Sequence, residues 1–156
     1  MHPNAQAITD FYEGFNKLNA GPMVKVYAPD AVFSDPAFPN LRGDEIGDMW
    51  TMLCGRAKGF SLTFRDVQAD ETKGSAHWEA DYLFQGGRKV HNVIDATFTF
   101  RDGKVIKHVD DFNFWRWSQM ALGLPGLLLG WSGMLKNKVQ AQAGAGLKEF
   151  RASKGT

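Results

Sequence analysis

SAHWEADYLFQGGRKVHNVIDATFTFRDGKVIKHVDDFNF, residues 75–114, is the stretch that decides the fold. Its apolar residues recur with a period of two, which predicts β-strands. Glycine-containing pairs at 86–87 and 102–103 divide it, and such pairs are typical of two-residue hairpin turns. We therefore predict three consecutive antiparallel strands, over 75–85, 88–101 and 104–114, preceded by a fourth over 61–70.

The residues before this meander have the spacing of helices. Apolar residues recur every three or four positions over 8–18 and over 46–54, which predicts two amphipathic helices. Between them, a Gly-Pro pair opens a short helix over 23–27, and 31–35 has the pattern of a short strand. A closing helix is predicted over 135–150. Helices followed by an antiparallel meander indicate an α+β fold.

Composition narrows the class of protein. The chain has 156 residues, the size of one domain, a formal net charge of +1, and no cluster of Lys and Arg that would attract nucleic acid. Cys54 is the only cysteine, and no zinc-type spacing of Cys and His is present, so we expect neither a disulfide nor a metal. The start lacks the pattern of a signal peptide, and the apolar stretch 120–131 is too short to span a bilayer. We expect a cytoplasmic protein.

Aspartates that interrupt strand-like apolar runs are the candidate catalytic residues. If both turns hold two residues, Asp95 faces Trp78 on one side and Asp110 on the other, on a mostly apolar inner face that also carries His108. Asp35 ends the earlier strand. Two carboxylates this close cannot both ionise freely, and carboxylates with shifted pKa values suit acid–base chemistry. A register slip of one residue would instead turn an aspartate of this pair to the outer face.

Several short segments, in this order, resemble one known superfamily. They are LNAG at 18–21, YAPDAVFSDP at 27–36, RG at 42–43 and FRDGKVI at 100–106. On these segments the chain resembles the nuclear transport factor 2-like superfamily, in its SnoaL-like and ketosteroid isomerase-like branch. The resemblance implies a cone: a strongly curved antiparallel sheet wrapped around helices, with a deep apolar pocket. It covers a core of about 4–116, and 117–156 is then an apolar and helical extension of the same domain.

The resemblance also implies roles for the aspartates. Asp35 stands where ketosteroid isomerases carry the base that shuttles a proton, and Asp95 where they carry a protonated aspartate that donates to the dienolate oxygen. The tyrosine that completes the oxyanion site of those enzymes has no counterpart, because Gly14 takes its place. In epoxide hydrolase-like relatives, Asp95 and Asp110 match the two aspartates, whereas Val93 stands in place of the arginine.

SnoaL-like cyclases need one base and a pocket, which Asp110 can supply with help from His108. We therefore expect an enzyme that transfers protons on a small hydrophobic, cyclic substrate, as an isomerase or cyclase. The alternatives are a non-catalytic module that binds a hydrophobic ligand and an epoxide hydrolase-like enzyme. No cofactor is expected. The predicted substrate-binding residues are aromatic: Tyr12, Phe15, Trp50, Trp78, Tyr82, Phe84 and Phe112.

We expect a homodimer that forms through the outer face of the sheet. The apolar segment 112–131 is too hydrophobic to lie free in water. It either packs on the domain or completes a dimer contact, or it forms a lid over the pocket; membrane contact is the least expected of its roles.

Overall fold

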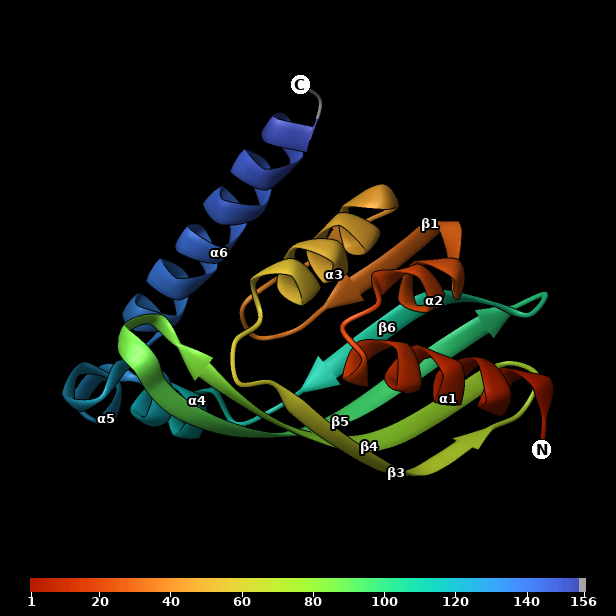
Figure 1. The fold of residues 1–156 in the computed structure, drawn as a ribbon, viewed down its shortest axis with the longest axis horizontal. Helices are drawn as coiled ribbons and strands as arrows, with labels where there is room; N and C mark the ends of the chain where they lie inside the picture. Colours follow the sequence, from red (N-terminus) through yellow and green to blue (C-terminus); the bar gives the residue numbers. More distant parts are fainter. Residues whose placement is uncertain (155–156) are drawn as a thin grey trace.

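One curved sheet of six strands forms the body of the molecule (Figure 1). The computed structural model describes residues 1–154. In the sheet, the strands follow the order β2-β1-β6-β5-β4-β3. They are β1 (Tyr27–Ser34), β2 (Leu41–Arg42), β3 (Ser61–Ala69), β4 (Lys73–Phe84), β5 (Arg88–Arg101) and β6 (Lys104–Asp111). The helices are α1 (Pro3–Asn16), α2 (Ala20–Lys25), α3 (Asp44–Arg56), α4 (Phe114–Leu122), α5 (Leu124–Leu129) and α6 (Gly133–Lys154), and a 3-10 turn, η1 (Gln85–Gly87), joins β4 to β5.

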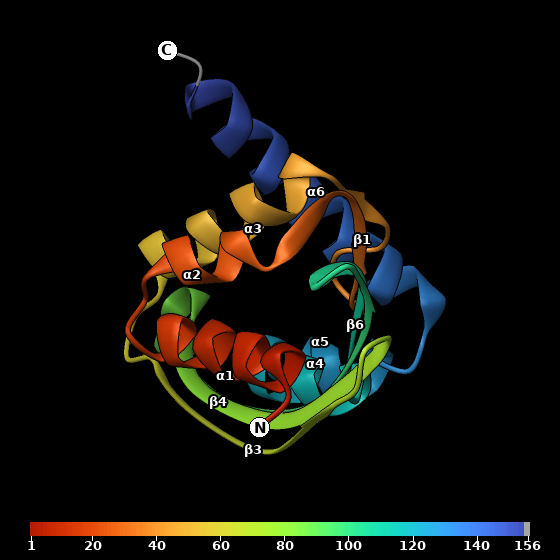
Figure 2. The ribbon, with the colours of Figure 1, turned by 90° about the vertical axis from the view of Figure 1, so that its right-hand side faces the viewer.

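The sheet bends around the first three helices (Figure 2). Its concave side faces α1, and α2 and α3 close the opposite side, so the apolar core lies between helices and sheet. The predicted α+β fold with a curved sheet is confirmed. The expectation of a wholly antiparallel sheet is wrong in one place, because β1 runs parallel to β6, with Phe33 opposite His108.

Local sequence explains where the early helices begin. Pro3 opens α1, where its missing N–H costs no hydrogen bond, and the side chain of His2 accepts the N–H of Asn4. The Asn19 side chain accepts from Gly21 N–H at the start of α2. The buried face of α1 includes Phe11, which meets the aromatic core edge-on.

The register of β5 differs by one residue from the prediction. The loop after β4 holds three residues, Gln85–Gly87, so that Trp78 faces Ile94 and His77 faces Asp95. The turn at 102–103 has the predicted two residues, with Arg101 opposite Lys104.

A bulge in β6 then shifts the second pairing as well. Phe100 faces Val105 but Thr99 faces Lys107, which leaves Ile106 as the extra residue. Together, the two shifts exchange the inner and outer faces for the side chains of β5 and leave those of His108 and Asp110 in β6 unchanged. His108 and Asp110 stay on the inner face, as predicted, whereas Val93 and Asp95 move to the outer face.

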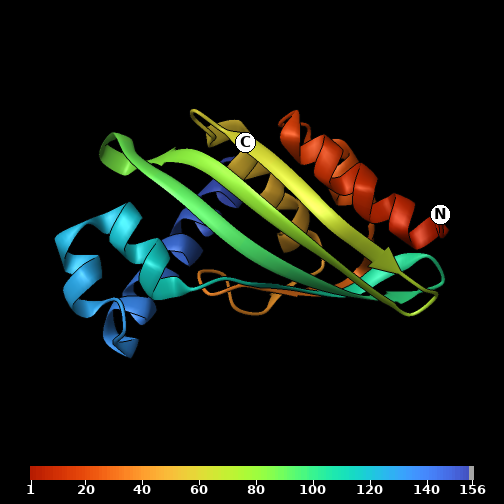
Figure 3. The ribbon, with the colours of Figure 1, turned by 90° about the horizontal axis from the view of Figure 1, so that it is seen from below.

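Helices α4 and α5 extend the molecule beyond the end of the sheet that carries the β4–β5 loop (Figure 3). Trp117 of α4 packs on Phe84, and its indole N–H donates to the hydroxyl of Tyr82 at 2.8 Å. Helix α5 lies against α4 so closely that a Cβ at Gly126 would overlap the carbonyl of Ser118. No helix of residues 1–154 is both long enough and apolar enough to span a bilayer.

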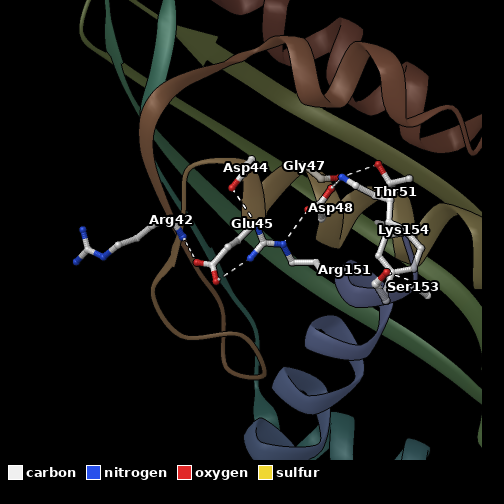
Figure 4. A network of polar contacts seen from close by, with 10 residues as sticks. Arg42, Asp44, Glu45, Gly47, Asp48, Thr51, Arg151, Ser153 and Lys154 are labelled. Carbon is white, nitrogen blue, oxygen red and sulfur yellow. Dashed lines mark hydrogen bonds and ion pairs between the residues drawn. The ribbon is translucent and has the colours of Figure 1, made fainter. Parts of the chain in front are cut away.

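Helix α6 returns to pack on α3, where charged residues hold it (Figure 4). Asp48 is buried, and it accepts hydrogen bonds from Arg151 at 2.9 Å and from Lys154. Asp44 and Glu45 also pair with Arg151. Further along α6, Gln140 donates to the carbonyl of Pro36 at 3.0 Å, next to Asp35. The C-terminal extension is therefore attached to the body of the protein at two places along this helix.

Candidate functional site

A buried imidazole lies at the centre of the candidate site. His108 has no exposed surface, and its ring stacks on Phe98 at 4.2 Å. The edges of Phe11 and Phe33 complete an aromatic cage around it. Both ring nitrogens have partners, because Nδ1 lies 2.7 Å from the hydroxyl oxygen of Tyr27 and Nε2 lies 2.9 Å from Oδ1 of Asp110.

The directions of the hydrogen bonds follow from the donors. The indole N–H of Trp50 can only donate, and it lies 3.0 Å from the Tyr27 oxygen. Burial raises the pKa of Tyr27 well above its usual value, so its hydroxyl keeps its proton and donates it to Nδ1 of His108. We therefore assign the remaining ring proton to Nε2, which donates to the Asp110 carboxylate. The result is a directed chain from Trp50 through Tyr27 and His108 to Asp110.

Asp110 is the chemically available end of this chain. It is 3% exposed, and its Oδ1 accepts from His108. Within residues 1–154, Oδ2 receives no hydrogen bond. A buried carboxylate held by one oxygen, with the other unoccupied, can take a proton from a bound molecule.

Asp35 is the second carboxylate of the site, at the end of β1. Its Oδ1 accepts the backbone N–H groups of Ala37 at 2.7 Å and Phe38 at 2.6 Å. Burial raises the pKa of Asp35 to about 7; the Phe38 N–H opposes this shift, and the negative charge of Asp110 adds to it. Asp35 can therefore both donate and accept a proton near neutral pH.

Two buried donors have no hydrogen-bond partner among the described residues: the hydroxyl of Tyr12 and the indole N–H of Trp78. The two rings lie 5.7 Å apart, on α1 and β4. Burial, followed by the charge of Asp110, raises the pKa of Tyr12 well above its usual value, so this hydroxyl stays protonated. Leaving a buried polar group unpaired costs about 1–3 kcal/mol, and a bound oxygen acceptor would remove that cost.

The other predicted substrate-binding residues fall into two groups. Phe15 and Trp50 are core residues that contact each other edge-on, 5.2 Å apart. Tyr82, Phe84 and Phe112 are half-buried and pack around Trp117 at the α4 end of the sheet. Burial raises the pKa of Tyr82 to about 12, and the negative charge of Asp35 contributes to this rise. Tyr82 is therefore close enough to Asp35 to sense its charge. Roles in binding stay predictions for all of these residues.

The predicted position of Asp95 on the inner face is wrong. The three-residue loop turns it outward, where it is exposed and accepts from His77 at 2.9 Å. It belongs to an outer-face row of alternating carboxylates and imidazoles. The row runs Asp95, His77, Glu79, His91, Asp81. Asp95 therefore does not share a site with Asp35 and Asp110.

Tyr27 is a functional candidate that the sequence prediction missed. The sequence predicts a short helix over 23–27, whereas Tyr27 begins β1 and its hydroxyl reaches His108 of the parallel neighbour β6. The parallel pairing of β1 and β6 brings these two residues together. A local sequence pattern does not predict a pairing between segments 81 residues apart.

The hollows found on the surface lie away from these carboxylates. One crosses the outer face of β3 to β6 near Lys73 and Thr97, and another lies between α1 and α2 near Gly14. A deep apolar pocket at the site stays a prediction. Nowhere in residues 1–154 do three or more His, Cys, Asp or Glu side chains group so as to hold a metal ion.

A family model for the SnoaL-like domain matches residues 8–108, which is 101 of the 156 residues. The chain belongs to the SnoaL-like domain family. The match includes Tyr12, Asp35 and His108, and it ends two residues before Asp110. No curated protein matches this SnoaL-like chain significantly.

Solved structures share the fold at low sequence identity. An NTF2-like protein of unknown function from Burkholderia pseudomallei superposes with a TM-score of 0.69 at 14% identity, over 78% of this chain and 99% of that one. An LEH-like epoxide hydrolase from M. tuberculosis gives 0.65 at 19%, over 81% and 96%. A candidate polyketide cyclase from Xanthomonas campestris gives 0.62 at 18%, over 76% and 96%. The SnoaL-like chain therefore has the NTF2-like fold.

Proposed function

We propose that this SnoaL-like protein is an enzyme that moves a proton on a small hydrophobic molecule carrying a carbonyl group, as an isomerase or cyclase. The observation that carries the proposal is the combination around Asp110: a buried carboxylate with one unoccupied oxygen, and two buried donors without acceptors. The Asp110 carboxylate can remove a proton, and the two donors can bind the substrate oxygen that becomes negative.

The step is balanced as follows. Oδ2 of Asp110 takes the proton from the carbon next to the carbonyl, and the electron pair of that C–H bond moves into the carbonyl, forming an enolate. The Tyr12 hydroxyl and the Trp78 indole N–H donate to the enolate oxygen. For isomerisation, Asp110 gives the proton that it took to another carbon of the enolate. For ring closure, the enolate carbon attacks a second carbonyl, the alkoxide that forms takes a proton from Asp35, and Asp110 then passes its proton to Asp35.

Tyr27, His108 and Asp35 have supporting parts in this step. His108 and Tyr27 hold the Asp110 carboxylate in place through a fixed pair of hydrogen bonds. Asp35, with a pKa of about 7, can supply the proton that the alkoxide takes during ring closure at neutral pH. The SnoaL-like fold and the epoxide hydrolase and cyclase neighbours agree with small-molecule chemistry in this class.

Hydrogen–deuterium exchange tests the proposal without knowledge of the product. A panel of cyclic enones and 1,3-diketones is incubated with the protein in D2O, and exchange at the acidic carbon is followed by NMR. Asp110→Asn should slow exchange by about 10²–10⁴-fold, the usual contribution of a general base. Asp95→Asn is the matched control, because it removes an exposed carboxylate of the same sheet.

Three results would contradict the proposal. Equal exchange rates for Asp110→Asn and Asp95→Asn would remove Asp110 from the chemistry. Tight retention of a panel compound without exchange would favour the non-catalytic binding module, and release of diols from epoxides in a parallel assay would favour the epoxide hydrolase-like enzyme.

A further inference from the structure

An exposed apolar surface covers the outer side of the C-terminal helices. We call it the cap surface, and it consists of Trp115, Leu124, Leu127, Leu128, Trp131 and Met134. Trp131 is 75% exposed, Leu124 64% and Leu128 58%. Positions 124, 127 and 128 have the spacing of one face of α5, and Trp131 follows in the turn after this helix. Helix α5 lies at the end of the molecule away from the N-terminus (Figures 1 and 3).

Two hydrogen bonds fix the tryptophans of the cap surface on the residues of α5. The indole N–H of Trp115 donates to the carbonyl of Leu127 at 3.1 Å, and that of Trp131 donates to Leu128 at 2.8 Å. These bonds hold both indoles against α5. Because both indole N–H groups already donate to backbone carbonyls, these tryptophans need no hydrogen bond from water or from a partner.

The charged side chains of the segment that carries the cap surface all have one sign. Residues 112–148 contain Arg116, Lys136, Lys138 and Lys148 and no Asp or Glu. The 17 acidic residues all lie in the other 119 positions, about one in seven, so 37 consecutive residues without one set this segment apart. Arg88 adds a further cation beside it, since its guanidinium lies against Gly123 and donates to Met120.

We propose that the cap surface lies on a lipid bilayer that carries anionic headgroups. Exposed leucines and tryptophans flanked by cations alone are the composition of segments that rest in the membrane interface without crossing it. The cations then meet the lipid phosphates, and the apolar side chains of the cap surface enter the boundary of the acyl chains. This differs from the expectation from sequence, where the exposure of these residues could not be seen.

Charge also argues against a second copy of this chain as the occupant. A symmetric contact through the cap surface would place Arg116 and Lys138 of one copy close to the same cations of the other. No acidic residue of the segment is available to pair with them. An anionic lipid surface supplies the missing negative charge.

Vesicle co-sedimentation of the full chain tests the proposal. The protein should sediment with vesicles of equal parts phosphatidylcholine and phosphatidylglycerol, and not with phosphatidylcholine alone. Replacing Leu128 and Trp131 together by Ser should weaken binding by about tenfold or more, because two exposed apolar side chains are lost. Val24→Ser is the matched control, since Val24 is an exposed apolar residue on α2.

Two charge-reversal variants test the electrostatic contribution to membrane binding. Lys138→Glu should weaken binding by about tenfold, whereas Lys73→Glu, which changes net charge equally at the start of β4, should not. Thermal unfolding of each variant checks that the fold is kept. No binding to the anionic vesicles, equal binding to neutral ones, or equal effects of the paired variants would overturn the proposal. The proposal would also be overturned if the unchanged protein bound no lipid but formed a dimer, and if replacing Leu128 and Trp131 abolished that dimer.

Discussion

The hydroxyl of Tyr27 lies 2.7 Å from Nδ1 of His108, although 81 residues separate them in the chain. The contact exists because β1 and β6 are parallel neighbours. It orients the imidazole, and the imidazole in turn holds Asp110.

Tyr27→Phe should destabilise the protein by about 2 kcal/mol. The substitution leaves Nδ1 of His108 without a donor and the indole N–H of Trp50 without an acceptor, both in the core. Urea unfolding followed by circular dichroism measures the change in the free energy of unfolding. A change below about 0.5 kcal/mol would show that water replaces the hydroxyl.

Tyr12→Phe should have the opposite effect in the same core. The Tyr12 hydroxyl is buried and unpaired, so removing it should leave stability unchanged or raise it by about 1 kcal/mol. Exchange of the carbonyl substrate should nevertheless slow by about 10²–10³-fold, as for loss of an oxyanion donor. A loss of stability as large as that of Tyr27→Phe would indicate that Tyr12 has a partner in solution.

The Asp35 carboxyl should titrate near pH 7, which carbon-13 NMR of the side chain can follow. Burial raises its pKa from 3.8 to about 7, so the folded state holds the proton more tightly than the unfolded chain. The free energy of unfolding should therefore fall as pH rises from about 4 to about 7, by on the order of 4 kcal/mol at most. In Asp35→Asn this part of the pH dependence should vanish. A titration near pH 4 would exclude Asp35 as the second proton carrier.

His77 on the outer face should titrate above its usual pKa. Hydrogen bonds to Asp95 and then Glu79 raise the pKa of His77, so the stability it contributes is present below pH 6.5 and is lost as pH rises through the folded value. Asp95→Asn should return the pKa of His77 toward 6.5 in a proton NMR titration. His91 is the internal control, because its partners are Asp81 and Glu79. Equal shifts of the two histidines would mean that the row titrates as one unit.

Asp48→Asn should loosen α6 from α3. Burial raises the pKa of Asp48, but hydrogen bonds from Lys154 and Arg151 outweigh it and hold the pKa below its usual range. Its contribution is thus present above about pH 4 and is lost on further acidification. We expect a cost of about 1–2 kcal/mol and faster amide exchange in α6. Asp44→Asn, at an exposed member of the same cluster, should change little; identical effects would count against a special role of Asp48.

The sequence predicts the elements of this fold better than their registers. Periodicity identifies the long strands and the first and third helices, because buried faces impose it. A hairpin register depends on a single residue: Gln85 joins the loop, and Ile106 bulges from β6. Neither feature has a clear composition signal. The two shifts cancel for β6, which is why His108 and Asp110 could be predicted on the inner face while Asp95 could not.

The two carboxylate–imidazole pairs described above are alike in atoms and opposite in surroundings. His108 and Asp110 are sealed inside the sheet, whereas His77 and Asp95 stand on its outer surface, and both pairs have the same 2.9 Å separation. One polypeptide thus contains the same carboxylate–imidazole pair in two environments, the protein interior and water. Added salt and bulk proton concentration act directly on the outer pair, and the inner pair responds chiefly to whatever displaces water beside it. The pair that we propose to be reactive is therefore shielded from ionic conditions that act directly on the surface pair.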